Sequence, residues 1–316
     1  MNTESISHKI AWKNGRTIPA SQAVLPVEDM GIVHGVCVTE MMRTFSGQAY
    51  EVDKHLDRLF RSAAQVGIPI QYTSDKIRQH LLDVVKHNQE IIPDWQEQGV
   101  IVFATPGINA TYTGGTGQNE ATLVIHTFDL PAELWVDAVA SGQHLAISAV
   151  PMVPDICLPV SAKTRSRLVF HLADQQVQRE FPGARAILLN NQGYVRETGT
   201  SNLFFVRKNQ IFTAPVDTVL PGISREIVIK IARSLGLEVI EKDFCVDELF
   251  SADEIFTTST PYCLLGVSQL NGKQVSDVYP GPVTMSLLNS WSERIGQNIH
   301  AQLLEMAQHR QDVTDQ

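Results

Sequence analysis

The spacing of hydrophobic residues predicts alternating helices and strands along the chain. Two helices and two buried strands are predicted in the N-terminal third, over 53–66, 74–88, 100–104 and 121–125. Asp53 and Ser74 are the expected N-caps of the two helices, because short polar side chains accept hydrogen bonds from the first turn. Asn14-Gly15, between two short apolar runs, predicts a tight β-hairpin close to the N-terminus.

The rest of the chain continues this alternation. Strands are predicted over 145–150, 184–190, 194–197, 202–207, 210–213 and 237–242, and helices near 165–180 and over 223–235. A last helix is expected from about Pro282, with an apolar stripe formed by Leu288, Trp291, Ile295, Ile299 and Leu303. The polar tail 308–316 is expected to fray. This mixture predicts an α+β fold.

Turn-forming and proline-containing segments indicate where the chain divides. We expect a small N-terminal α/β domain over 1–126, a linker over 127–133 that contains Pro131, a large domain over 134–288, and a helical extension with a tail over 289–316. A glycine-rich segment, 113–117, lacks the spacing of a phosphate-binding loop and has no following Gly-Lys-Ser/Thr. It is predicted to be a mobile loop.

Composition excludes several classes of protein. The 316 residues are 43% hydrophobic, which is enough for a full core, and no apolar run is long enough to span a membrane. A net charge of −9 and the lack of a basic block argue against nucleic-acid binding. Four widely spaced cysteines give no metal-binding motif, so no metal site is expected, and they fit a reducing cytoplasm.

The segment from Tyr194 to Val206 carries the most specific chemistry. Glu197 ends a predicted strand and is followed by small hydroxyl residues and glycine, then by Asn202 and a second apolar strand. A carboxylate at a buried strand end is costly unless a cation meets it. The segment resembles the signature of the fold-type-IV pyridoxal-phosphate enzymes, which include branched-chain and D-amino-acid aminotransferases and aminodeoxychorismate lyases. The resemblance implies a two-domain fold and pairs Glu197 with the pyridine nitrogen of pyridoxal 5'-phosphate.

Further segments resemble this family from about Ile10 to about Val283, in the family's order. Lys163, framed by small residues, lies where the family keeps its Schiff-base lysine, and such an amine must be able to lose its proton. The resemblance implies that Arg58, on the first predicted helix, binds the cofactor phosphate, and a guanidinium suits a phosphate. It assigns Ser224, the amide of Ile223 and Thr260 to the same phosphate, and Asn202 also belongs to the cofactor site.

The resemblance implies an aminotransferase that moves an amino group between an amino acid or amine and a 2-oxo acid. It also implies a homodimer. The alternative is a lyase of the aminodeoxychorismate type, although Thr39-Glu40 is closer to the transaminase form. A third interpretation, a cofactor-binding protein without turnover, conflicts with the complete Lys163 and Glu197 motifs.

The substrate is not identified by the sequence. The residues by which branched-chain and D-amino-acid members bind the substrate carboxylate are missing, and Pro261 has no amide N–H to offer. Four side chains are candidates for substrate contact: Arg43, Thr39, Tyr262 and Arg165. Arg43 is the leading candidate because it follows Glu40 on the strand that enters the expected cofactor cleft. A structural ion pair with Glu40 or another carboxylate explains this arginine equally well.

Overall fold

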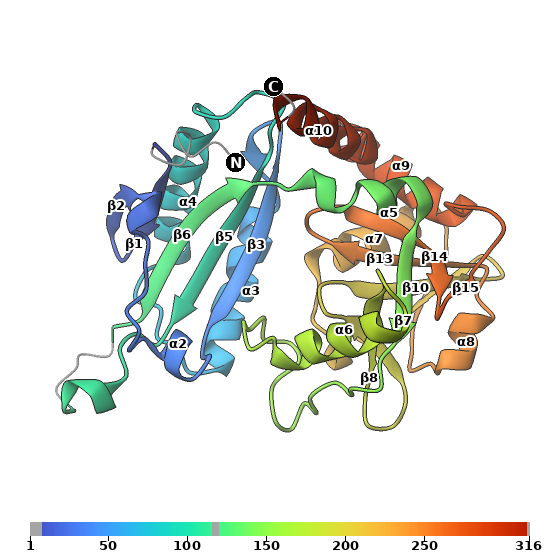
Figure 1. Cartoon of the computed structure of the whole chain (residues 1–316), viewed down its shortest axis with the longest axis horizontal. Coiled ribbons are helices and arrows are strands. Elements are labelled where there is room, and N and C mark those ends of the chain that lie inside the picture. Colours follow the sequence, from blue (N-terminus) through green and yellow to red (C-terminus); the bar gives the residue numbers. More distant parts are fainter. Residues whose placement is uncertain (1–7, 116–119, 315–316) are drawn as a thin grey trace. The chain divides into compact units, whose positions relative to one another are not determined.

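The computed structural model describes residues 8–115 and 120–314. The chain forms two compact units (Figure 1). Unit 1 comprises the chain up to Leu130 together with Ala162–Ser166, and unit 2 comprises Pro131–Ser161 and the chain from Arg167 onward. The division at 130/131 falls inside the expected linker, but strand β6 (Thr122–Asp129) continues past His126 because its apolar residues remain paired in the sheet. The glycine-rich segment 113–117 lies partly outside the described residues.

Unit 1 is built on a six-stranded sheet in the order β2-β1-β6-β5-β3-β4. Its other strands are β1 (Ile10–Lys13), β2 (Arg16–Pro19), β3 (Val38–Phe45), β4 (Gln48–Ala49) and β5 (Gln98–Thr105). The predicted hairpin is confirmed, because β1 pairs with β2 across Asn14 and Gly15, whose φ values of 46° and 86° lie in the left-handed region. Asn tolerates that region and Gly prefers it.

Helices α3 (Val52–Gln65) and α4 (Ser74–Gln89) share one hydrophobic core with this sheet. The core contains Leu56 and Leu59 of α3 and Leu81 of α4, all with no exposed surface. Both helices were predicted within one residue of their bounds, but neither cap was. Glu51, with φ 55°, precedes α3, and Asp53 lies in its first turn. Thr73, not Ser74, caps α4 by accepting from the amide of Lys76.

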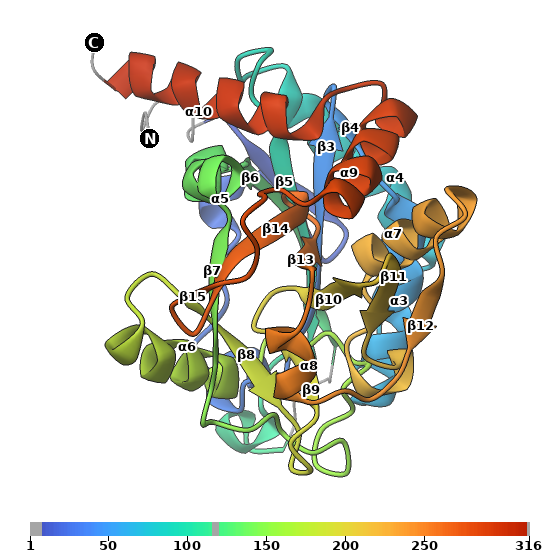
Figure 2. The same cartoon turned by 90° about the vertical axis from the view of Figure 1, so that its right-hand side faces the viewer.

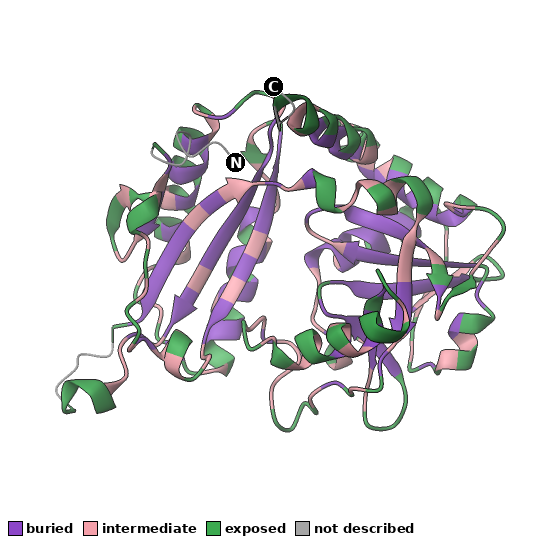
Figure 3. Ribbon diagram, viewed as in Figure 1, coloured by how far each residue is buried: buried purple, intermediate pink, exposed green. Residues whose placement is uncertain are grey.

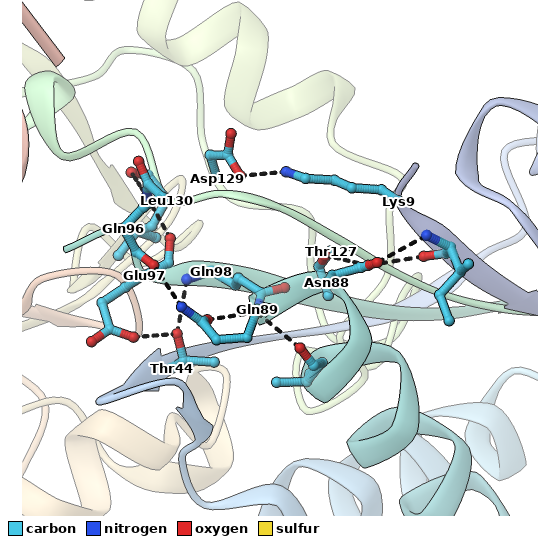
Figure 4. Close-up of polar contacts among 12 residues, drawn as sticks. Lys9, Thr44, Asn88, Gln89, Gln96, Glu97, Gln98, Thr127, Asp129 and Leu130 are labelled. Atoms are coloured by element: carbon cyan, nitrogen blue, oxygen red, sulfur yellow. Dashed lines mark hydrogen bonds and ion pairs between the residues drawn. The ribbon is translucent and has the colours of Figure 1, made fainter. Parts of the chain in front are cut away.

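A buried polar network closes one end of the unit 1 sheet (Figure 4). Glu97 is 4% exposed, and its carboxylate accepts the Thr44 hydroxyl and the amides of Ser46 and Gly47. The Asn88 side chain bridges α4 to β1 through both backbone groups of Ile10. These bonds satisfy polar groups that the ends of the strands would otherwise bury unpaired.

Six strands of unit 2 form a closed ring, and three more extend from it, which makes nine strands among the described residues. They are β7 (Gln143–Ile147), β8 (Arg185–Leu189), β9 (Val195–Thr198), β10 (Asn202–Arg207), β11 (Gln210–Thr213), β12 (Val239–Glu241), β13 (Glu254–Ser259), β14 (Cys263–Leu270) and β15 (Lys273–Gln274). The strand order is β12-β11-β10-β13-β14-β7-β8-β9. Strand β9 also pairs with β10, so β10, β13, β14, β7, β8 and β9 close into the ring. Closure leaves few exposed edges among these strands.

Helices cover the ring from different sides. They are α5 (Val136–Ser141), α6 (Leu168–Glu180), α7 (Ile223–Ser234), α8 (Val246–Phe250), α9 (Pro282–Ile295) and α10 (Ile299–Thr314). Helix α6 packs on β7 and β8 through Ala173 and Val177, while α7 and α9 pack on β13. The strands are mostly buried, and most of the helices carry both buried and exposed residues (Figure 3).

The C-terminal region differs from the single long helix expected. Gly296, with φ 77°, ends α9, and α10 begins three residues later, on the outside of unit 2 (Figure 2). The expected stripe is buried on both sides of the break, with Trp291 in α9 and Ile299 in α10. Helix α10 continues to Thr314, so the tail from 308 is helical up to that residue. Among the described residues, no helix is long and apolar enough to cross a membrane.

Candidate active site

Glu197 lies in unit 2, on strand β9, at one end of a row of polar groups. It is 6% exposed and is paired in register with Asn202 of β10. Its Oε2 accepts from the Asn202 side chain at 3.1 Å and from the amide of Leu220 at 3.3 Å. Asn202 also donates to the carbonyl oxygen of Leu220 at 2.9 Å. The carboxylate is therefore held in a fixed orientation by β10 and by the segment that leads into α7.

The first turn of α7 approaches this row very closely. A Cβ on Gly222, the N-cap residue, would lie only 2.0 Å from Oδ1 of Asn202, so no side chain fits there. Among the described residues, no side-chain cap hydrogen bond is made at the N-cap of α7, which is a glycine, and Ile223 and Ser224 at its start are 7% and 8% exposed. An uncapped helix N-terminus offers amide N–H donors and the positive end of the helix dipole. This end of α7 is therefore suited to an anion.

These groups fit a phosphorylated pyridine. A fixed carboxylate can hold a protonated ring nitrogen, and amide donors with a serine hydroxyl can hold a phosphate. Thr260, half-buried just beyond β13, belongs to the turn that joins β13 to β14. The structure thus brings Glu197, Asn202, Ile223 and Ser224 together within unit 2.

Lys163 belongs to unit 1, although the large domain was expected to contain it. The segment 162–166 runs antiparallel to the start of β3, with a bridge between Val38 and Thr164. The amide of Thr39 donates to the Lys163 carbonyl oxygen at 2.9 Å, and the Lys163 amide donates to Oγ of Ser62 on α3 at 3.0 Å. Two elements of unit 1 therefore fix the backbone of a half-buried lysine.

Arg58 forms a buried ion pair with Glu40. Arg58 Nε lies 2.6 Å from Oε1 of Glu40, and Nη2 lies 2.7 Å from Oε2. Nδ1 of His55 is 2.7 Å from the same Oε2, and since an ionised carboxylate only accepts, the imidazole donates. Arg58 is one helical turn before Ser62, so both lie on one side of α3.

The electrostatics of this cluster are dominated by Arg58. Burial alone raises the pKa of Glu40, but the attraction and hydrogen bonds of Arg58, assisted by His55, outweigh it and lower the pKa from 4.5 to about 2. Burial lowers the pKa of His55, which Glu40 only partly opposes. Glu40 is thus ionised and His55 neutral near pH 7.

The four substrate candidates are placed very differently. Arg165 is exposed, and its guanidinium lies over the ring of Phe103 at 5.6 Å. Phe103 is paired in register with half-buried Thr39, so both lie on the same face of the sheet. Arg43 is only 1% exposed, donates to the carbonyl oxygen of Thr44, and lies 4.0 Å over the ring of Phe45.

Tyr262 is enclosed within unit 2. It is 3% exposed, and its hydroxyl lies 3.0 Å from that of Thr257, which bonds to Gln143. Burial raises the pKa of Tyr262, and hydrogen bonds from Ser201 and its other neighbours offset only part of that rise. The hydroxyl belongs to a buried chain of hydrogen bonds that runs through Thr257 of β13 to Gln143 of β7, which makes it a poor substrate contact.

Several residues of the site were missed by sequence reasoning. Glu40 was considered as part of a family motif and as a partner of Arg43, whereas it pairs with Arg58. Ser62 and the amide of Leu220 were not considered, and Arg225 of α7, 4% exposed, pairs with Glu241 of β12. Only Glu40 had a usable signal, since an acidic residue in an otherwise apolar strand requires a buried partner.

Comparison with known proteins assigns the family. The family model for class IV amino-transferases matches residues 37–270. The D-alanine aminotransferase of Bacillus licheniformis is 29% identical over 276 residues, which cover 87% of this chain and 93% of that protein. The branched-chain-amino-acid aminotransferase of Escherichia coli K12 is 26% identical, with 86% of this chain and 88% of that protein covered.

A solved structure agrees with these relatives. The branched-chain amino acid aminotransferase of Escherichia coli superimposes with a TM-score of 0.83 at 25% identity, covering 92% of this chain and 94% of that one. The fold is therefore that of the fold-type-IV enzymes. The chain belongs to the class IV aminotransferase family, and it is a pyridoxal-phosphate-dependent aminotransferase.

Proposed function

We propose that Lys163 is the lysine that attaches to the cofactor aldehyde, and that Glu197 pairs with the ring nitrogen. Arg58, Ser224, Thr260 and the amide of Ile223 bind the phosphate in this proposal, and Asn202 holds Glu197. The observation that carries it is the Glu197 carboxylate, 6% exposed and oriented by two N–H donors beside the uncapped start of α7.

The bound cofactor supplies an electron sink next to the α-carbon of the substrate. The chain's own residues then have separate tasks. Lys163, once released, moves the α-proton through its Nζ as general base and acid. Glu197 keeps a proton on the ring nitrogen, and Arg58 with the start of α7 fixes the phosphate. Lys163 is positioned by bonds at its own amide and carbonyl, so its side chain can move without loss of those bonds.

The substrates in this proposal are an amino acid or amine donor and a 2-oxo acid acceptor. The relatives' names include both D-alanine and branched-chain amino acids. They support an aliphatic α-amino acid as the substrate and leave its D or L configuration open. Arg165 is our candidate for the substrate carboxylate. It is exposed beside Lys163, on the sheet face that carries Thr39 and Phe103, whereas Arg43 is enclosed by Thr44 and Phe45.

The proposed assembly is a homodimer in the cytoplasm. The segment that precedes β3 exposes Val24, Val27 and Ile32, at 64%, 75% and 59%. These apolar side chains support a contact with a second subunit. The exposed thiols of Cys157 and Cys245 suit a reducing compartment. Light scattering of the purified protein would test the dimer, since a monomeric mass at micromolar concentration contradicts it.

Borohydride reduction tests the central assignment. The purified protein, incubated with pyridoxal phosphate and then reduced, should carry the cofactor on the peptide that contains Lys163. Lys163→Ala should abolish this adduct, while Lys230→Ala, a change on the exposed side of α7, should leave it unchanged. An adduct on another lysine would refute the role of Lys163. Incubation with 2-oxoglutarate or pyruvate and a panel of donors of both hands would then identify the substrates.

A further inference from the structure

We infer that Thr258 binds the cofactor phosphate through its hydroxyl, in addition to the residues proposed above. The inference rests on the proposed function, because the ligand is the phosphate of pyridoxal phosphate. Thr258 belongs to β13 and is only 2% exposed.

The position of Thr258 follows from strand register. Asn202 of β10 is paired with Glu197 of β9 on one side and with Thr258 of β13 on the other. Directly opposed residues of neighbouring antiparallel strands point to the same face of a sheet. Glu197, Asn202 and Thr258 therefore form a row across three strands, with the carboxylate at one end and the threonine hydroxyl at the other.

The Thr258 hydroxyl has no hydrogen-bond partner among the described residues. Its neighbour Thr257 points to the opposite face, where its hydroxyl bonds to Gln143 and Tyr262. Buried hydroxyl groups in folded proteins are nearly always bonded, so an orphaned one calls for a missing partner. A ligand acceptor at this position supplies it.

The surroundings identify that ligand as an anion. Helix α7 packs on β13. Its N-cap residue, Gly222, lies directly against the side chain of Asn202, the middle residue of this row. Side chains two residues apart in an extended chain point to the same side. Thr260 is two residues after Thr258, directly beyond the end of β13. Glu197 takes the ring nitrogen at the far end of the row, so the acceptor nearest Thr258 is a phosphate oxygen.

The experiment compares Thr258→Val, which removes the hydroxyl at nearly constant shape, with Thr258→Ser, which keeps it. Thr257→Val is the matched control on the opposite face. Full-length protein depleted of cofactor is titrated with pyridoxal phosphate, with pyridoxal and with inorganic phosphate, and the melting temperature of each cofactor-depleted variant is recorded.

We expect Thr258→Val to weaken pyridoxal phosphate binding about 10-fold or more, as the loss of one hydrogen bond to a charged acceptor implies. Its melting temperature without cofactor should not fall, because no protein partner is lost. Pyridoxal should bind as in the wild type, inorganic phosphate more weakly, and Thr258→Ser should keep most of the affinity. Thr257→Val should show the reverse, with a lower melting temperature and a smaller change in affinity.

Two results would overturn the inference. Unchanged affinity of Thr258→Val for pyridoxal phosphate would mean that the hydroxyl binds water or nothing. An equal loss for pyridoxal would place it on the ring. If the wild-type protein itself binds no pyridoxal phosphate, the proposed function fails as well, so the two failures are distinguishable.

Discussion

The Glu40 carboxylate accepts two hydrogen bonds from one edge of the Arg58 guanidinium, with Nε 2.6 Å from Oε1 and Nη2 2.7 Å from Oε2. Glu40 is fully buried and Arg58 is 3% exposed. A guanidinium is planar and carries five N–H donors, so this bidentate pair fixes the plane of the group. Glu40 thus orients the cation that we propose for the phosphate.

Glu40→Gln should weaken cofactor binding indirectly, through Arg58. An amide cannot accept both Arg58 donors as a carboxylate does, and breaking a buried pair costs about 3–5 kcal/mol of folding stability. We expect a lower melting temperature and faster loss of cofactor on dilution. Glu226→Gln, on the exposed side of α7, is the control and should change neither. Retention equal to the wild type would show that Glu40 does not position Arg58.

The lowered pKa of Glu40 also predicts a specific acid sensitivity. Because the carboxylate is favoured in the folded state, its contribution is complete above pH 4.5 and is lost as the pH falls toward about 2. The pKa change corresponds to about 3 kcal/mol at most. Urea unfolding at pH 6 and pH 3 should show a smaller loss of stability in Glu40→Gln than in the wild type. Equal losses would mean that other carboxylates control acid unfolding.

Glu197→Gln should slow chemistry more than it weakens cofactor binding. An amide cannot keep the ring nitrogen protonated, and loss of such electrostatic stabilisation typically costs roughly 100- to 1000-fold in rate. Single-turnover mixing with an amino donor, followed by the cofactor absorbance, measures the half-reaction directly. Asn202→Ala should give a smaller loss, since the Leu220 amide still orients the carboxylate. A near-normal half-reaction in Glu197→Gln contradicts the proposed role.

The fold could be predicted where local pattern decides it. The Asn14-Gly15 hairpin and the stripe of Leu56 and Leu59 follow from turn chemistry and helical spacing, and the structure confirms both. The break at Gly296 could not be inferred from the apolar stripe, because that stripe stays in phase across it.

Long-range placement was not accessible in the same way. The pairing of Glu40 with Arg58 joins a strand to a helix, and no local pattern distinguishes Arg58 from Arg43 as its partner. The addition of Lys163 to unit 1 likewise depends on a bridge between Val38 and Thr164, far apart in the chain. That the Thr258 hydroxyl has no hydrogen-bond partner among the described residues can be recognised only from the positions of the neighbouring polar groups.

The last prediction concerns the substrate carboxylate and separates Arg165 from Arg43. A charge-assisted hydrogen bond contributes about 1.5–3 kcal/mol, so Arg165→Ala should raise the KM for an α-amino acid donor roughly 10-fold or more. The KM for 1-phenylethylamine, which has no carboxylate, should stay within a factor of two or so. Arg61→Ala, an exposed change on α3, is the control and should leave both unchanged.

Arg43→Ala should behave differently, because Arg43 is 1% exposed and packs on Phe45. Truncation leaves a cavity and removes the bond to the Thr44 carbonyl oxygen, so a lower melting temperature is expected, with similar changes in KM for both donors. The two variants thus differ in the ratio of the KM values and not in activity alone. If Arg43→Ala raises only the KM of the amino acid donor while Arg165→Ala changes neither, Arg43 binds the carboxylate and the assignment to Arg165 is wrong.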